Sequence, residues 1–92
     1  MEDSRKFNRF FTLLKAQFFT DREIGRQKCT VFSVSHKGIG IRFHTCEKIN
    51  LGSTIFLKIY IDDRLEPLNV NGTLVWIEEM EKDYIGGIAL SK

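Results

Sequence analysis

The sequence predicts an all-β domain built as an antiparallel barrel or sandwich, and three observations support that prediction. Apolar and polar residues alternate with period two over most of the 92 residues. The alternating segments are rich in Ile, Val, Phe and Thr, the residues that strands prefer. Turn-forming segments with Gly, Pro, Asn or Asp separate these short runs, as is typical of all-β folds.

The first element has two possible interpretations. Five apolar residues repeat at helical spacing, and this pattern alone predicts a short amphipathic helix: Phe7, Phe10, Phe11, Leu14 and Phe18. The alternative is a coil through Phe11 and then a strand over Leu13–Thr20, with Leu14, Ala16 and Phe18 facing inward. Periodicity does not decide between them.

The following segments are predicted as strands in order along the chain. Thr30, Phe32 and Val34 share one face of the first. Apolar side chains share a face along Ile39–Phe43 and Ile55–Ile61, and the pattern resumes at Ile85 and Gly87–Leu90. The predicted turns between strands are Thr20–Lys28, His36–Gly38, Glu47–Ser53, Asp62–Pro67 and Glu79–Asp83.

One predicted strand, Leu68–Ile77, contains a conflicting signal. Asn71-Gly72 is a strong hairpin signal that could split the segment in two, or Gly72 could mark a bulge. The apolar set stays in phase from Leu68 to Trp76, which favours one strand. On this pattern Trp76 belongs to the core and lies outside any binding site.

Length and composition indicate one domain over residues 1–92. Hydrophobic residues make up 42% and charged residues 28%, as in ordinary folded domains. Met1 leads directly into charged residues, so we expect no signal peptide, and no apolar run approaches the roughly 20 residues of a membrane span. Cys29 and Cys46 match no disulfide or metal spacing, so we expect reduced thiols and a cytoplasmic location without membrane insertion.

Charge is distributed unevenly along the chain. The net charge of +2 is too small to predict non-specific nucleic-acid binding. Residues 1–28 hold seven Lys or Arg against four acids, whereas residues 78–83 hold four acids and one Lys. This favours a short anionic ligand near the basic end and disfavours DNA, because a duplex needs a broader basic face.

No catalytic centre is predicted, so we expect a binding module and not an enzyme. Ser35 and His36 are strand neighbours that point to opposite faces, which excludes a catalytic pair. Gly38-Ile39-Gly40 lacks the third glycine and the following helix of a dinucleotide-binding loop. His44 and Cys46 match no zinc pattern, so we expect neither a metal nor a cofactor.

Two segments hold residues suited to an anionic nucleotide. Arg5 and Arg9 are four residues apart, and guanidinium groups bind phosphate and the guanine edge bidentately and stack on bases. Ser33 and Ser35 lie two apart on a predicted strand, so their hydroxyls face the same side. Gly38 permits a tight turn or the close approach of a ligand. We therefore predict these five residues as ligand-binding.

Both segments resemble the signature of PilZ domains, bacterial receptors of cyclic di-GMP. That signature is Arg-x-x-x-Arg followed by Asp/Asn-x-Ser-x-x-Gly. The chain has Arg5-Lys6-Phe7-Asn8-Arg9 and Ser33-Val34-Ser35-His36-Lys37-Gly38. Later landmarks are similar and occur in the family's order: Leu51-Gly52, Gly72-Thr73-Leu74-Val75-Trp76 and Tyr84-Ile85-Gly86-Gly87-Ile88.

The resemblance implies a six-stranded antiparallel β-barrel over residues 12–92 and a flexible N-terminal arm over residues 1–11. Arg5 and Arg9 would lie in the arm and wrap the ligand, with Ser33, Ser35 and Gly38 beneath it. It also favours a strand over a helix after the arm. The implied function is binding of cyclic di-GMP, relayed through ordering of the arm to a partner protein or a fused domain.

Ser33 departs from the family pattern, because the family has an acid or amide there. A carboxylate accepts two hydrogen bonds from a guanine edge, and losing a good bidentate contact costs about 1–3 kcal/mol. We therefore expect weakened binding. The alternative is a degenerate PilZ-fold adaptor that binds proteins and no nucleotide. A third hypothesis, single-stranded nucleic-acid binding, fails if Phe43 and Phe56 are buried.

Overall fold

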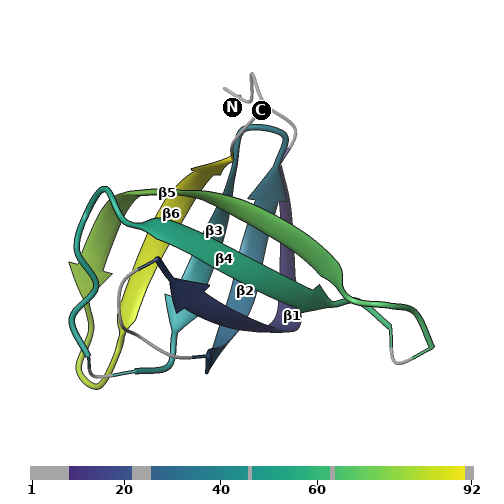
Figure 1. Cartoon of the computed structure of the whole chain (residues 1–92), viewed down its shortest axis with the longest axis horizontal. Coiled ribbons are helices and arrows are strands. Elements are labelled where there is room, and N and C mark those ends of the chain that lie inside the picture. Colours follow the sequence, from purple (N-terminus) through teal and green to yellow (C-terminus); the bar gives the residue numbers. More distant parts are fainter. Residues whose placement is uncertain (1–8, 22–25, 46, 63, 91–92) are drawn as a thin grey trace.

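The strands close into a six-stranded antiparallel β-barrel (Figure 1). The computed structural model describes residues 9–21, 26–45, 47–62 and 64–90, with the backbone alone for residues 9–12. Around the barrel the order is β1-β2-β3-β6-β5-β4, which confirms the barrel and excludes the sandwich. The strands are β1 (Arg9–Thr20), β2 (Gln27–Ser35), β3 (Gly38–Phe43), β4 (Thr54–Tyr60), β5 (Leu68–Glu79) and β6 (Tyr84–Leu90).

β1 begins at Arg9, within the segment that was expected to belong to the arm. Residues 9–11 pair with residues 33–35 of β2, and the ladder shifts register between Phe11 and Leu14. From Lys15 onward β1 pairs with both β2 and β4. The helical interpretation is wrong for this segment, because its backbone groups bond to neighbouring strands instead of to the preceding turn. Residues 1–8, which include Arg5, lie outside the described residues.

Inward-facing side chains from all six strands fill the barrel. The alternating sets of β3 and β4 are buried as predicted, from Ile39 to Phe43 and from Ile55 to Ile59. Phe18 and Phe43 meet edge to face, with ring centroids 4.9 Å apart. Ile61 was expected to continue this set but is 56% exposed, because β4 ends one residue earlier.

Cys29 is a free thiol in this core, with 3% of its surface exposed. Burial raises the pKa of the Cys29 thiol to about 12, so the group stays protonated and unreactive at neutral pH. Cys46 lies outside the described residues. No helix among the residues that the structure describes is long and apolar enough to cross a membrane.

β2 contains a bulge at Phe32. Its ladder to β3 shifts register between Val31 and Ser33, so Phe32 has no partner on β3. Because a bulge advances the chain by one residue, Phe32 and Ser33 both face outward while Val34 packs against the core. The prediction that Thr30, Phe32 and Val34 share one face is therefore wrong at Val34.

β5 contains a second bulge at Val75, where its ladder to β6 shifts register between Leu74 and Trp76. Leu74 is 1% exposed, whereas Val75 is 52% and Trp76 44% exposed. The prediction that Trp76 belongs to the core is therefore wrong, because the bulge reverses the phase of the alternation after Leu74. Leu68, at the start of the same predicted stripe, is also exposed.

β5 runs unbroken through Asn71-Gly72, which confirms one strand and excludes the hairpin. Both residues pair with β4. A Cβ atom at Gly72 would overlap the backbone carbonyl of Ala89 on β6, so this glycine permits a close approach of two strands. The bulge that was considered at Gly72 lies at Val75 instead.

Candidate ligand-binding site

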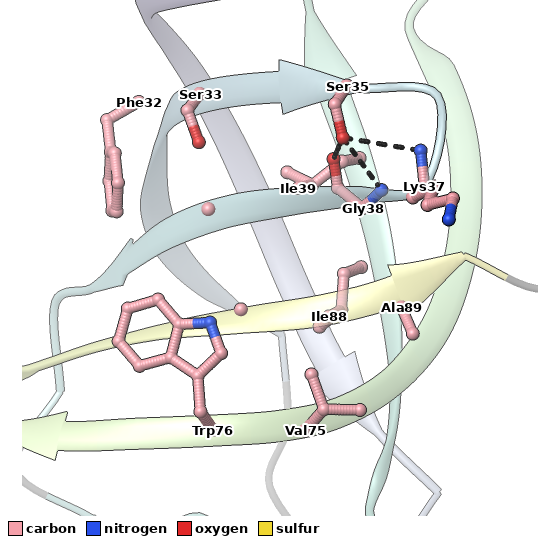
Figure 2. Close-up of a pocket in the computed structure, with 12 residues that line it drawn as sticks. Phe32, Ser33, Ser35, Lys37, Gly38, Ile39, Val75, Trp76, Ile88 and Ala89 are labelled. Carbon is pink, nitrogen blue, oxygen red and sulfur yellow. Dashed lines mark hydrogen bonds between the residues drawn. The ribbon is translucent and has the colours of Figure 1, made fainter. Parts of the chain in front are cut away.

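A pocket lies on the outside of the barrel over β2, β3, β6 and β5 (Figure 2). One row of paired residues crosses its floor, with Ser33 opposite Gly40, Gly40 opposite Gly87 and Gly87 opposite Trp76. Since the two central positions are glycine, no side chain rises from the middle of the floor. The Phe32 ring and the Trp76 indole lie at its sides in Figure 2.

The glycines of the floor are in close contact with the side chains around it. A Cβ atom at Gly40 would lie 2.6 Å from the Ser33 hydroxyl oxygen and 2.8 Å from the Phe32 ring. A Cβ atom at Gly87 would overlap the Trp76 indole. The aromatic rings can lean over β3 and β6 only because these positions have no side chain.

Ser35 holds the turn between β2 and β3. Its hydroxyl oxygen accepts hydrogen bonds from the backbone N–H groups of Lys37 at 3.3 Å and Gly38 at 3.2 Å, and it donates to the Gly38 carbonyl at 3.3 Å. Its one donor and two acceptor positions are thus used within the turn. Ser33 and Ser35 both line the pocket, which confirms that they face the same side.

Gly38 has a structural role that the sequence did not indicate. A Cβ atom there would lie 2.5 Å from the Ile88 carbonyl oxygen on β6. Immediately beside it, the Leu90 N–H donates to the Lys37 carbonyl at 3.1 Å. Gly38 therefore lets the end of β6 pack against the turn.

The register of β1 brings the arginine segment to this turn. Arg9 pairs with Ser35, so the end of the first motif and the middle of the second are neighbours in the barrel. The Arg9 side chain and all of Arg5 lie outside the described residues. Lys37 is exposed and lines the pocket, so the pocket already has a cation.

The family comparison can be set beside this geometry. The sequence matches the family model described as PilZ domain over residues 3–91. The chain belongs to the PilZ domain family. No curated protein matches it.

Two solved structures share the fold of this PilZ domain. One is the Bacillus subtilis inhibitor of motility (MotI/DgrA), with a TM-score of 0.73 and 13% identity over 99% of this chain and 44% of that one. The other is the PilZ domain of YcgR from Escherichia coli with c-di-GMP, with a TM-score of 0.74 and 10% identity over 96% of this chain and 78% of that one. This chain thus spans less than half of the Bacillus protein, and identities this low show the fold alone.

Trp76 and Phe32 are the aromatic residues of the pocket, and sequence reasoning missed both. Both lie at bulges, and a bulge cannot be located from alternation alone. The available signal was the set of glycines at Gly40, Gly86 and Gly87, because glycine inside a strand indicates that another group approaches closely. That signal gives the position but not the identity of the group.

A polar cluster lies beyond Phe32, on the same side of the barrel. The Arg42 Nε atom donates to Asp83 Oδ2 at 2.9 Å, and His44 Nδ1 is 3.5 Å from the same oxygen. The hydrogen bond from Arg42 holds the pKa of Asp83 below its usual range. Among the described residues, no group of three or more His, Cys, Asp or Glu side chains gathers as metal ligands would.

Proposed function

We propose that this PilZ domain is a cytoplasmic receptor that binds cyclic di-GMP in the pocket over β2, β3, β6 and β5. Arg5 from the N-terminal arm and Arg9 from the start of β1 would close over the nucleotide. The observation that supports this most is the pairing of Arg9 with Ser35, which makes the two motif segments neighbours. The free, buried thiol of Cys29 is consistent with a reducing compartment.

The pocket offers the groups that a cyclic dinucleotide needs. Arg5, Arg9 and Lys37 would contact the phosphates and the guanine edges. Trp76 and Phe32 lie beside a floor without side chains at its centre, so a flat base can lie there and contact an aromatic ring. Ser33 would contribute one hydroxyl where the family has an acid or amide, so we expect weaker binding than the full signature gives.

The relay would follow from the position of β1. Binding would order the part of the arm before β1, residues 1–8, against the turn between β2 and β3, and the changed surface would be recognised by a partner protein or a fused domain. Ser35 and Gly38 would act mainly by fixing the shape of that turn, because their contacts in the structure are with backbone groups.

Isothermal titration calorimetry with cyclic di-GMP tests this proposal on the wild type, Arg9→Ala, Ser33→Asp and a matched control. We expect Arg9→Ala to weaken binding about 10–100-fold and Ser33→Asp to strengthen it by up to a similar factor, since a bidentate contact is worth about 1–3 kcal/mol. Arg64→Ala removes an exposed cation from the loop between β4 and β5 and should change nothing.

The adaptor alternative has one observation in its favour. All hydrogen-bonding positions of the Ser35 hydroxyl are used within the turn, and Ser33 is a weak substitute for a carboxylate. Absence of heat with folded wild-type protein at tens of micromolar, together with absence of heat for Ser33→Asp, would favour the adaptor. Binding restored only in Ser33→Asp would identify Ser33 as the lost contact.

A further inference from the structure

The outer surface of β1, β4 and β5 lies on the opposite side of the barrel from the pocket. β4 and β3 are separated by two strands in either direction around the barrel. Two rows of paired, outward-facing residues cross these strands, Gln17–Lys58–Asn69 and Phe19–Phe56–Asn71. We call this surface, together with Arg26, the basic–aromatic face.

An aromatic stack is the main feature of the basic–aromatic face. The rings of Phe19 and Phe56 are nearly parallel, at an interplanar angle of 15° and a centroid distance of 4.9 Å. The guanidinium carbon of Arg26 lies 6.0 Å from the centre of the Phe19 ring, at the limit of a cation–π contact. Phe19 remains 38% exposed, so the stack presents apolar surface to solvent beside a cation.

The charged side chains that line a groove beside the stack have one sign among the residues that the structure describes. Nine of those residues line the groove, of which Arg26 and Lys58 are cationic and none is acidic. The others are the Phe19–Phe56 stack, Leu57, Val70 and the side-chain amides of Gln17, Asn69 and Asn71. Cations, amides and apolar surface together fit an acidic polypeptide segment that has an apolar anchor.

We infer that the basic–aromatic face binds an acidic segment of a partner protein, with an apolar side chain against the Phe19–Phe56 stack and carboxylates at Arg26 and Lys58. Within this face β4 is paired on both sides, with β1 and with β5, so the segment binds there through side chains and not by adding a strand. The inference deepens the relay in the proposed function. It leaves the pocket free, because the two surfaces lie on opposite sides of the barrel.

Two other occupants fit the face less well. Base stacking by single-stranded nucleic acid needs open ring faces, whereas Phe19 has Phe56 on one side and Arg26 nearby. Of the two rings whose burial was expected to decide this hypothesis, Phe43 is fully buried and Phe56 is only partly buried. The acidic turn of residues 78–83 could meet this face in a second copy of the chain. A head-to-tail contact between two different surfaces of one molecule generates open chains unless the rotation between copies closes a ring.

The experiment is a titration of ¹⁵N-labelled protein, without cyclic di-GMP, followed by amide chemical shifts. The probe is a twelve-residue peptide of Glu and Asp around a central Phe-Leu pair, and its control replaces the acids with Gln and Asn. We expect saturable shifts at Phe19, Lys58 and Asn71 with the acidic peptide, and none of comparable size at Ser35–Gly38. An interface this small gives weak affinity, in the range of about 10–500 μM.

Charge-reversal variants locate the binding. Arg26→Glu/Lys58→Glu should weaken the peptide at least about tenfold, whereas Lys48→Glu/Lys82→Glu, which makes the same charge change at exposed sites elsewhere, should change it less than about twofold. Equal loss of peptide binding in both variants, or shifts centred on Ser35–Gly38, would overturn the inference.

Tighter binding of an eight-residue oligouridine would assign the face to nucleic acid instead. Self-association at the same residues without peptide would assign it to a second copy. Because no nucleotide is present, failure here leaves the calorimetric test of the pocket unaffected.

Discussion

Two faces of the barrel differ in the regularity of their strands. One carries the pocket over β2, β3, β6 and β5, which we call the pocket face, and the other is the basic–aromatic face. The pocket face carries bulges at Phe32 and Val75, and its central row contains Gly40 and Gly87. The basic–aromatic face has unbroken registers, from Lys15 to Thr20 against β4 and along the whole contact of β4 with β5. On the pocket face, strand bulges and two glycines form a recess bordered by aromatic rings. On the basic–aromatic face, regular alternation places a continuous set of side chains on the outside of the barrel.

The difference explains why the two faces were not equally predictable. Where the register is regular, the period-two pattern assigns each side chain to the inside or the outside. Where a bulge intervenes, every later residue changes sides until the strand ends. The binding hypothesis therefore depends on the part of the barrel that alternation describes least well.

The largest expected effect is on the free energy of unfolding, and it tests the position of the bulge at Val75. Leu74→Ala should lower the free energy of unfolding by about 2–5 kcal/mol, because it removes a fully buried side chain from the core. Val75→Ala should change it by less than about 0.5 kcal/mol, because Val75 faces solvent at the pocket. Urea denaturation measures both. A large loss for Val75→Ala would place the bulge elsewhere and remove the contrast between the faces.

A second pair of variants tests the glycines of the pocket face. Gly38→Val should destabilise the fold by about 1–3 kcal/mol, because its Cβ atom would press on the Ile88 carbonyl, a backbone group that cannot rotate away. For Gly87→Ala the three atoms nearest to the new Cβ all belong to the Trp76 indole, an exposed side chain that can swing outward. Its unfolding free energy should change by less than about 1 kcal/mol.

The fluorescence of Trp76 gives the readout that separates these two glycines. Trp76 is the chain's single tryptophan, so its emission reports on the pocket alone. Gly87→Ala should shift the emission to longer wavelength as the indole moves into water. Unchanged emission together with a large loss of stability would show that the indole is held rigidly as part of the fold.

The smallest expected effect concerns acid stability at the end of the pocket face. Asp83 joins the turn before β6 to Arg42 of β3, and this hydrogen bond holds the pKa of Asp83 below its usual range. A lowered native pKa contributes stability above the unfolded value of about 4, and that contribution is lost as pH falls through the native value. Asp83→Asn should therefore unfold at a lower urea concentration than the wild type at pH 7. Below about pH 4 its stability should decline less steeply with falling pH than that of the wild type. Urea midpoints across that range measure it, with Glu81→Gln on the same turn as the control.

Several parts of the fold and the site were predictable from the residues. The strands of β3 and β4 follow from alternating Ile, Leu and Phe, since only the buried side of a barrel requires large apolar groups at every second position. The turn at His36–Gly38 and the common side of Ser33 and Ser35 follow from local spacing. The start of β1 at Arg9 was not predictable, because it depends on pairing with residues more than twenty positions later in the sequence.

The sequence by itself determined the strand content, the family signature and the candidate residues Arg5, Arg9, Ser33, Ser35 and Gly38, because these depend on residue type and on spacing along one segment. Only the tertiary structure decided that Trp76 lies at the pocket, that Gly40 and Gly87 form its floor, and that Phe19 and Phe56 stack on the opposite face. Each of these depends on register between strands distant in sequence, and register is set by how the whole barrel closes.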